Sequence, residues 1–316
     1  MKRDSHNNNS LILFGAGASY GSDSYGTPPL SADLFSSLRR FNPEGWGRLD
    51  TALDELFIAD FERAMERLPE LASSITYGMW KTDLLFPLQK VMGLYFFTFI
   101  PDTTNLYVRM AKKIRASGWR GMLVTLNYER LLEISLRFNH LDPVVGVSPK
   151  EQNQIELCFP HGCCNLFCEH VMTASFSHPL INELADGPIV VVNCPLDYMQ
   201  RLDQCRMPPV MSFFTADKIS ASGGLIFLRA QRERYEEAVL NAEKIAIVGV
   251  RVRPHDKHIW DPLAKTSAKI IYCGGPTGAI EFTEWQHANR FSSNHIVLDS
   301  YLAEGFEELS REIGLD

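Results

Sequence analysis

Short apolar runs rich in β-branched residues alternate along the chain with longer stretches in which apolar residues recur at helical spacing. The longer stretches predict helices over 31–41, 104–118 and 228–243. The short runs predict strands over 11–14, 122–126, 189–192, 245–250, 270–273 and 295–298. Strands that alternate with helices favour an α/β protein with a mostly parallel sheet and helices on both faces.

The spacing of these elements predicts two insertions and a tail. The interval between the first two strands is too long for a single crossover, so we expect an inserted helical module over about 31–115. A small irregular module is expected over about 165–225. Residues 1–10 are polar and predict a flexible tail before a main domain over 11–316. The very apolar stretch 84–100 contains proline, glutamine and lysine, which favours a buried helix over a membrane span.

Composition narrows the function classes. Hydrophobic residues make up 45% of the chain and charged residues 22%, which is ordinary for a globular protein. The net charge of −7 gives no reason to expect direct binding of nucleic acid. The seven cysteines occur without the pattern of a secretory leader, so we expect free thiols and a cytoplasmic protein.

A glycine-rich loop follows the first predicted strand. Residues 15–19 read GAGAS, which resembles the start of a dinucleotide-binding turn. The third fingerprint position is Tyr20, with a glycine one residue late at Gly21, and Asp33 lies inside a helical pattern. A conventional dehydrogenase is therefore not expected. The loop alone fits two structures equally well: a phosphate cradle or a tight turn without a ligand.

Polar side chains follow the predicted strands at several further points. Each alone has an ordinary explanation, as a turn residue, a buried histidine or a helix cap. In a parallel sheet, however, the carboxyl ends of the strands share one edge, where ligands bind. The residues are Thr125, Asn127 and Glu129 at the end of the second strand, His161 and Gly162 after a further apolar run, Gly249 at the end of the strand over 245–250, and Asp256 and His258 in the loop that follows it.

The order of these motifs resembles the sirtuin family, in particular its divergent prokaryotic branch of NAD-cleaving domains. The family order is GAGxS, T-x-N-(Y/I)-(D/E), HG, and a glycine turn followed by D-x-H-I. The corresponding residues here are 15–19, 125–129, 161–162 and 249–259. The resemblance implies a Rossmann-like domain with two inserted modules.

The resemblance also implies NAD as the substrate and roles for individual residues. Asn127 is expected to contact the nicotinamide ribose and order a water, and His161 to accept a proton. Glu129 is expected near the ribose, where it orients His161 or stabilises positive charge, whereas Asp256 either bonds a ribose hydroxyl or caps a helix. The residues expected to bind the cofactor are Gly15, Ala16, Gly17, Ser19, Thr125, Glu129, Gly249, Asp256, Gly274 and Gly275.

Departures from the family pattern favour hydrolysis of NAD over deacylation of proteins. The G-I-P-D-F-R segment of protein-deacylating sirtuins is absent, and Arg251 replaces an expected serine. No CxxC pair is present among Cys164, Cys168, Cys194 and Cys205, so we expect no zinc and no other metal. The expected products are nicotinamide and ADP-ribose. An NAD-dependent deacylase or ADP-ribosyltransferase, and a non-catalytic NAD or ADP-ribose sensor, remain alternatives.

The resemblance further implies an effector of bacterial antiphage defence that is controlled by assembly. Because the expected domain fills nearly all 316 residues, control is expected from copies of the chain or from a second protein. By family resemblance that protein is a ring-forming ATPase or a short argonaute-type protein. Trp46 and Trp80 of the helical module are expected to be exposed at such an interface. No membrane partner is expected.

Overall fold

The fold is described from a computed structural model of the chain. The structure describes residues 9–23, 26–49, 53–61, 63–65, 67–68, 81–169, 187–205, 207–212, 223–253 and 256–316. Most of the expected tail, residues 1–8, therefore lies outside the described residues. Ser10 already belongs to the first strand and is buried, so the main domain begins one residue earlier than the sequence pattern suggested.

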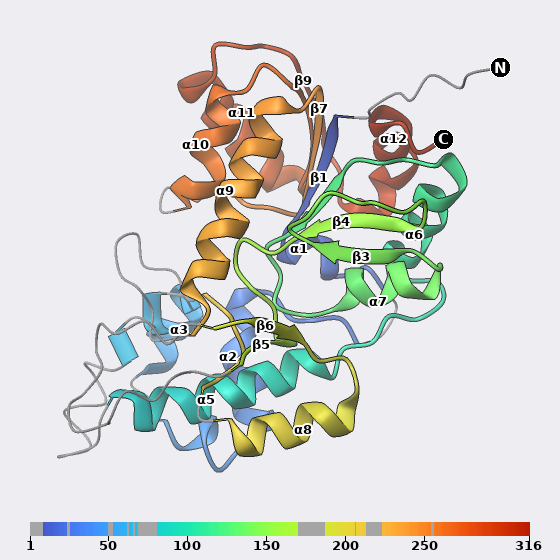
Figure 1. Cartoon of the computed structure of the whole chain (residues 1–316). Helices are drawn as coiled ribbons and strands as arrows, with labels where there is room; N and C mark the ends of the chain where they lie inside the picture. The colour runs from blue at the N-terminus through green and yellow to red at the C-terminus, as the bar shows by residue number, and fades with distance from the viewer. Residues whose placement is uncertain are drawn as a thin grey trace.

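A seven-stranded parallel sheet forms the centre of the molecule (Figure 1). Its strand order is β3-β4-β2-β1-β7-β8-β9, with β1 in the middle, which confirms the expected Rossmann-like α/β fold. The strands are β1 (Ser10–Phe14), β2 (Met122–Thr125), β3 (Asp142–Val145), β4 (Gln154–Cys158), β7 (Lys244–Val248), β8 (Lys269–Cys273) and β9 (His295–Leu298).

Helices cover both faces of this sheet (Figure 1). Side chains alternate along β1, so that Ile12 and Phe14 enter one hydrophobic core and Leu11 and Leu13 the other. Because both of its faces are buried, the central strand β1 reads as a nearly continuous apolar run. One face carries α6 (Leu106–Ser117), α7 (Leu131–Phe138) and α12 (Leu302–Ile313), and the other carries α9 (Leu225–Asn241), α10 (Lys257–Lys265) and α11 (Gly275–Asn289).

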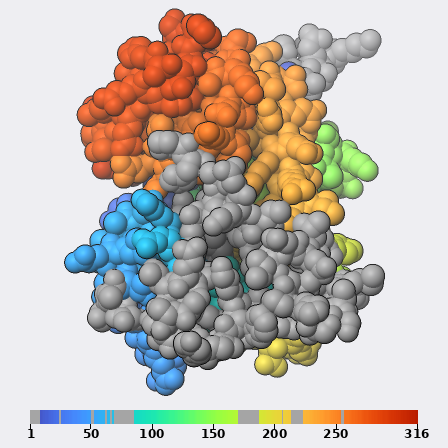
Figure 2. Space-filling view, turned by 90° about the vertical axis from the view of Figure 1, so that its left-hand side faces the viewer, coloured from blue at the N-terminus to red at the C-terminus, as the bar shows by residue number. Residues whose placement is uncertain are grey.

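A helical module lies between β1 and β2 in the chain. It comprises α2 (Ser31–Phe41), the 3-10 helix η1 (Trp46–Arg48), α3 (Asp54–Ala59) and α5 (Lys81–Phe97). In Figure 2 the part of this module near residues 30–60, in blue, lies below the orange and red C-terminal elements.

The expected exposure of Trp46 is wrong. Trp46 is fully buried, it packs against Phe57 and Phe61, and its indole N–H donates a hydrogen bond to the Leu88 carbonyl. A buried tryptophan with a satisfied N–H belongs to the core of the module and offers no interface. Trp80 lies outside the described residues.

A second, two-stranded antiparallel sheet joins β5 (Leu166–Cys168) to β6 (Ile189–Val191), followed by α8 (Pro195–Gln204). The apolar run at 189–192 therefore forms a strand, as expected, but this strand is not part of the main sheet. The pattern of the sequence did not predict β3, β4 and β5 as strands. Among the described residues, no helix is both long and apolar enough to cross a membrane.

Candidate active site

The register of the sheet brings the predicted motifs to one edge. Phe14 pairs with both Thr125 and Val248, and Val248 pairs with Cys273, so four neighbouring strands end at the same level. On the other side of β2, Val124 pairs with Cys158 at the end of β4. The segments that follow these strand ends carry Gly15, Asn127, Gly249, Gly274 and His161.

The glycine loop packs directly against the turn after β7. Gly15 directly follows β1 and is the N-cap residue of the short helix α1 (Ala16–Ser19). Gly249 has φ = +63°, and a Cβ built on it would lie 2.1 Å from the Ala18 nitrogen. A Cβ on Gly15 would lie 2.7 Å from the Gly249 oxygen. Glycine is therefore needed at these positions because the two backbones touch, and the sequence pattern did not reveal this contact.

The amides of this loop already have acceptors within the chain. The Gly15 N–H donates to the Val248 carbonyl and the Gly17 N–H to the Gly249 carbonyl, each at 2.9 Å. The Ala18 N–H donates to the Gly15 carbonyl, also at 2.9 Å. In this conformation these three amides fix the loop in place.

Four buried side chains form a hydrogen-bond network beside the loop. Ser19 donates its hydroxyl proton to Glu129 Oε1 at 2.5 Å. Ser19 Oγ in turn accepts from Asn127 Nδ2 and from the Tyr107 hydroxyl, both at 2.9 Å. One donor and two acceptor positions of the serine hydroxyl are thus all used. The Ser19 side chain is therefore an anchor for its neighbours rather than a group turned towards a ligand.

Asn127 is held in one orientation by this network. Its Nδ2 donates to the Gly15 carbonyl at 3.1 Å, an atom that can only accept, so the two ends of the amide are distinguished. Its backbone N–H donates to Thr125 Oγ1 at 3.1 Å, which gives Thr125 a structural role here. Within the part of the chain that the structure describes, no group donates to Asn127 Oδ1. That oxygen is the atom of Asn127 best placed to accept a hydrogen bond from a ligand.

Glu129 links the network to the start of α7. Its second carboxylate oxygen accepts from the Leu131 N–H at the start of α7. Burial raises the pKa of Glu129 above its usual value, although the hydrogen bond from Ser19 opposes that shift. The suggestion that Glu129 orients His161 is not what the structure shows, because its hydrogen bonds go to Ser19, Asn127 and Leu131.

Tyr107 is a member of the network that sequence reasoning missed. It lies in the first turn of α6 and is 1% exposed, and its ring packs edge-on against Phe14. Burial raises the pKa of its hydroxyl well above the usual value, so Tyr107 stays protonated and can donate to Ser19. In the sequence it reads as one more apolar position of an amphipathic helix, and no local signal marks its partner.

Replacing Tyr107 with phenylalanine should lower the free energy of unfolding by about 1 kcal/mol, because Ser19 loses a donor while the ring packing remains. Urea unfolding of the purified variant measures the change. Tyr235→Phe is the matched control, because it removes another buried hydroxyl, one that donates to the Ile259 carbonyl outside the network. An unchanged free energy in Tyr107→Phe alone would mean that this hydroxyl adds nothing to the network.

His161 lies after β4 and faces a second histidine. Its Nε2 is 2.9 Å from Nε2 of His258, and the two rings are tilted by 46°. The imidazole also donates a hydrogen bond to the Leu126 carbonyl. Burial, with His258 and Arg232 nearby, lowers the pKa of His161 well below its usual value. The buried surroundings of His161 therefore favour its neutral form.

Of the two roles expected for Asp256, the structure speaks against capping of a helix by its side chain. Asp256 occupies the N-cap position of α10, but its side chain makes no capping hydrogen bond. Instead the carboxylate of this buried residue lies close to the side chains of His161 and His258. The bond from Asp256 to a ribose hydroxyl stays a prediction.

The remaining expected residues lie at the end of β8. Gly274 precedes α11, and Gly275 has φ = +74° and donates its N–H to the Ser300 carbonyl at 2.9 Å. A Cβ on Gly274 would meet the side chain of Tyr272, and a Cβ on Gly275 would meet that of Tyr301. Arg251, which replaces the serine of the sirtuin motif described above, pairs with Glu281 of α11 at the surface.

The cysteines do not fit a zinc site of the sirtuin kind. Cys164 and Cys168 are buried, Cys194 is exposed and Cys205 is half-buried. Among the residues that the structure describes, these four do not come together as a group of potential ligands. Burial raises the pKa of Cys164 well above its usual value, which favours the neutral thiol.

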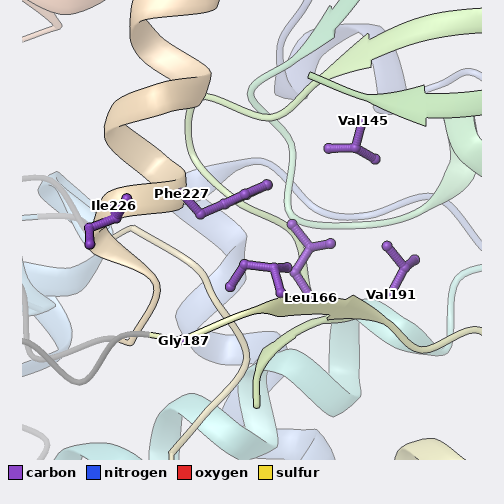
Figure 3. A pocket seen from close by; sticks show the side chains of 7 residues that line it. Val145, Leu166, Gly187, Val191, Ile226 and Phe227 are labelled. Carbon is purple, nitrogen blue, oxygen red and sulfur yellow. The ribbon is translucent and has the colours of Figure 1, made fainter. Parts of the chain in front are cut away.

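An apolar cavity of about 650 Å³ lies beside the small sheet (Figure 3). Leu166 and Val191 of that sheet point into it, together with Val145 from the end of β3 and Phe227 from the start of α9, and Ile226 also lines it. The cavity therefore lies where the small module meets the main domain. Its lining is apolar, which suits an aliphatic group better than a charged one.

No protein-family model and no curated protein matches the chain. Solved structures do match over nearly its whole length. A structure described as Sir2 bound to acetylated peptide has 13% identity and a TM-score of 0.43, with 97% of this chain and 94% of that chain covered.

Two further matches are complexes of related proteins. A Sir2 homolog–NAD complex has 14% identity and a TM-score of 0.43, covering 97% of this chain and 91% of that one. A mutant Sir2 homologue in complex with ADP ribose has 15% identity and a TM-score of 0.43, covering 96% and 91%. At this identity the matches describe the fold alone. In its fold the chain is similar to Sir2 proteins, as the order of its sequence motifs predicted.

Proposed function

We propose that this protein is an NAD glycohydrolase, which cleaves NAD with water to nicotinamide and ADP-ribose. The observation that carries the proposal is the fixed amide of Asn127. Its Nδ2 is anchored on the Gly15 carbonyl and on Ser19, which leaves Oδ1 for a ligand at the carboxyl edge of the sheet. Complexes with NAD and with ADP ribose among the similar structures agree with this choice of substrate.

The chemistry asks little of the protein beyond positioning. The nicotinamide ring of NAD is a cationic leaving group, so the bond from C1′ of the ribose to the ring nitrogen breaks without a strong acid. Its electron pair stays on the ring nitrogen, and the transition state resembles an oxocarbenium ion. Asn127 Oδ1 would hold a ribose hydroxyl or the attacking water in place, an effect of orientation.

His161 is the proposed proton acceptor. Water that forms a bond to C1′ must lose one proton, and a neutral imidazole with a lone pair can take it and pass it to solvent. His161 follows β4, the strand beside β2, which brings it to the same edge as Asn127. The glycine loop and the turn at Gly249 would lie along the diphosphate, and Gly274 and Gly275 near the adenosine half.

The test is to incubate the purified protein with NAD and to separate the products by chromatography, with and without an acylated peptide. Equal amounts of free nicotinamide and ADP-ribose without peptide support the hydrolase. Turnover that needs the peptide would make the protein a deacylase. Binding of NAD without consumption would make it a sensor.

The apolar cavity favours the deacylase as the second candidate. Its apolar lining could hold the aliphatic part of an acylated side chain, and it lies between the small sheet and α9. An ADP-ribosyltransferase would instead place ADP-ribose on a protein acceptor, and mass spectrometry of the same reaction detects that product.

We further propose that the enzyme acts in antiphage defence and is controlled by assembly, either with its own copies or with a ring-forming ATPase or short argonaute-type protein. Because Trp46 is buried, we propose helix α8 as the interface instead. Leu196 and Met199 lie three positions apart on this helix and are 67% and 51% exposed.

The isolated chain should therefore cleave NAD slowly, and its turnover per chain should rise with protein concentration. Light scattering and NAD turnover across one concentration series measure both quantities. The double variant Leu196→Glu and Met199→Glu should remain a monomer with low turnover, because charged side chains oppose burial of this face. A monomer with full turnover at every concentration would contradict control by assembly.

A further inference from the structure

Three side chains with metal-binding atoms converge after β4 and β7. Nitrogen atoms of His161 and His258 and a carboxylate oxygen of Asp256 all lie within 4.8 Å of one another. His161 and Asp256 are buried and His258 is half-buried. Within the described ranges this is the one group of three or more such residues that could hold an ion.

The spacing of the two imidazoles suits a shared ion. Two nitrogen atoms that each lie about 2.0–2.1 Å from one metal ion, at 90–110° to each other, are about 2.9–3.4 Å apart. The two Nε2 atoms here are 2.9 Å apart. The rings are tilted by 46° with centroids 5.1 Å apart, so the nitrogens face one another and the rings are not stacked.

The far side of His161 is arranged as metal-bound histidines commonly are. Such a histidine donates its other ring N–H to a carbonyl or carboxylate, which fixes the ring and directs the lone pair of the ligating nitrogen. Here the Leu126 carbonyl accepts a hydrogen bond from the imidazole of His161. With Nε2 turned to His258, Nδ1 is the nitrogen that donates.

The charges at this place favour a divalent ion held by mixed ligands. Asp256 contributes one negative charge, while Arg232 contributes a positive charge nearby. Arg232 is kept in place by hydrogen bonds to the Pro160 carbonyl and to Ser212 Oγ. Two imidazoles and one carboxylate form a ligand set that suits zinc, iron and cobalt, and the weak net charge disfavours calcium or magnesium.

We propose that His161, Asp256 and His258 form a binding site for a divalent first-row transition metal ion. This differs from the zinc site of protein-deacylating sirtuins, because no cysteine takes part. It also departs from our expectation of no metal, which rested on the spacing of the cysteines alone. The half-buried side of His258 gives the ion access from solvent.

The ion would control the reaction of the proposed function. It would occupy the Nε2 lone pair of His161, the atom that is proposed to accept the proton from water. Binding of the ion and acceptance of the proton are therefore mutually exclusive, so metal-loaded protein should cleave NAD at least about 10-fold more slowly. This consequence rests on the proposed function, whereas binding of the metal does not.

The test uses Co²⁺ as the probe, with the full chain after treatment with a chelator. Equilibrium dialysis with elemental analysis should give one Co²⁺ per chain, and the absorption spectrum should lack a thiolate-to-cobalt charge-transfer band. His258→Ala and Asp256→Asn should each weaken binding by at least about 10–100-fold. The exposed His287 on α11 provides the control, because His287→Ala should bind as the unchanged protein does.

Circular dichroism and urea unfolding show whether each variant is folded. Asp256→Asn keeps the shape of the side chain, so it still tests the site if His258→Ala does not fold. Absence of bound Co²⁺, a thiolate band, or equal binding by both ligand variants would overturn the site. Adding Co²⁺ and then a chelator to the NAD reaction is the separate, functional arm. Full turnover by the Co²⁺-loaded protein would overturn the exclusion between ion and proton, while the binding result would stand.

Discussion

Asn127→Ala should reduce the turnover of NAD by at least about 100-fold, because the reaction loses the group that positions the ribose or the water. The substitution also removes hydrogen bonds from the Gly15 carbonyl and from Ser19, so the free energy of unfolding should fall by about 1–3 kcal/mol. Chromatography of nicotinamide and ADP-ribose measures turnover, and urea unfolding measures stability.

Asn139→Ala is the matched control for this loss. Asn139 is also buried, and its Nδ2 donates to the Ser135 and Val108 carbonyls. It follows α7 and precedes β3, which places it at the amino edge of the sheet, away from the candidate site. We expect a similar loss of stability with turnover kept. Near wild-type turnover in folded Asn127→Ala, or an equal loss in both variants, would contradict the role of Asn127.

Gly249→Ala should lower the free energy of unfolding by about 2–5 kcal/mol. The left-handed backbone at φ = +63° contributes about 1–2 kcal/mol of this cost. Overpacking contributes about 1–3 kcal/mol more, because the new Cβ would lie 2.1 Å from the Ala18 nitrogen and 2.4 Å from the Gly17 carbonyl carbon. The displaced loop should also lose its affinity for NAD. Urea unfolding and calorimetric titration with NAD measure the two effects.

Gly118→Ala separates the two contributions. Gly118 ends α6 with φ = +69°, and nothing lies within 4 Å of the position of its Cβ. Only the conformational cost of about 1–2 kcal/mol is expected there. If Gly249→Ala cost no more than Gly118→Ala, the close contact between the glycine loop and the turn after β7 would be wrong.

The main strands and the edge that carries the site could be predicted from local patterns. The strands β1, β2, β7 and β8 are mainly apolar runs because both faces of the sheet are covered there, and such runs are visible without any knowledge of their neighbours. The edge strand β9 is only partly buried, but its Ile-Val-Leu run is visible in the same way. In a parallel sheet the motifs that follow such strands must meet at one edge. That rule alone placed Asn127 and the glycine loop together.

Other strands lacked this local signal. β3 lies at the edge of the sheet, begins Asp-Pro and is only partly buried, and a proline argues against a strand unless its edge position is known. β4 includes Gln154 and the buried Glu156, whose carboxylate is paired with Arg234 of α9. β6 has the composition of a strand, but composition does not say to which sheet it belongs.

The chemistry of the site depends on contacts between residues far apart in the chain. Ser19 and Tyr107 are 88 positions apart, and His161 and His258 are 97 apart. Hydrophobic periodicity and turn signals act over a few residues, so they identify Gly15, Asn127 and His161 as candidates at strand ends. Three features follow only from the packing of helices and loops around the sheet. They are the hydroxyl that anchors Asn127, the position of Asp256 beside two histidines, and the burial of Trp46. Side chains acquire those partners when distant segments are brought together, so the sequence near each residue does not predict them.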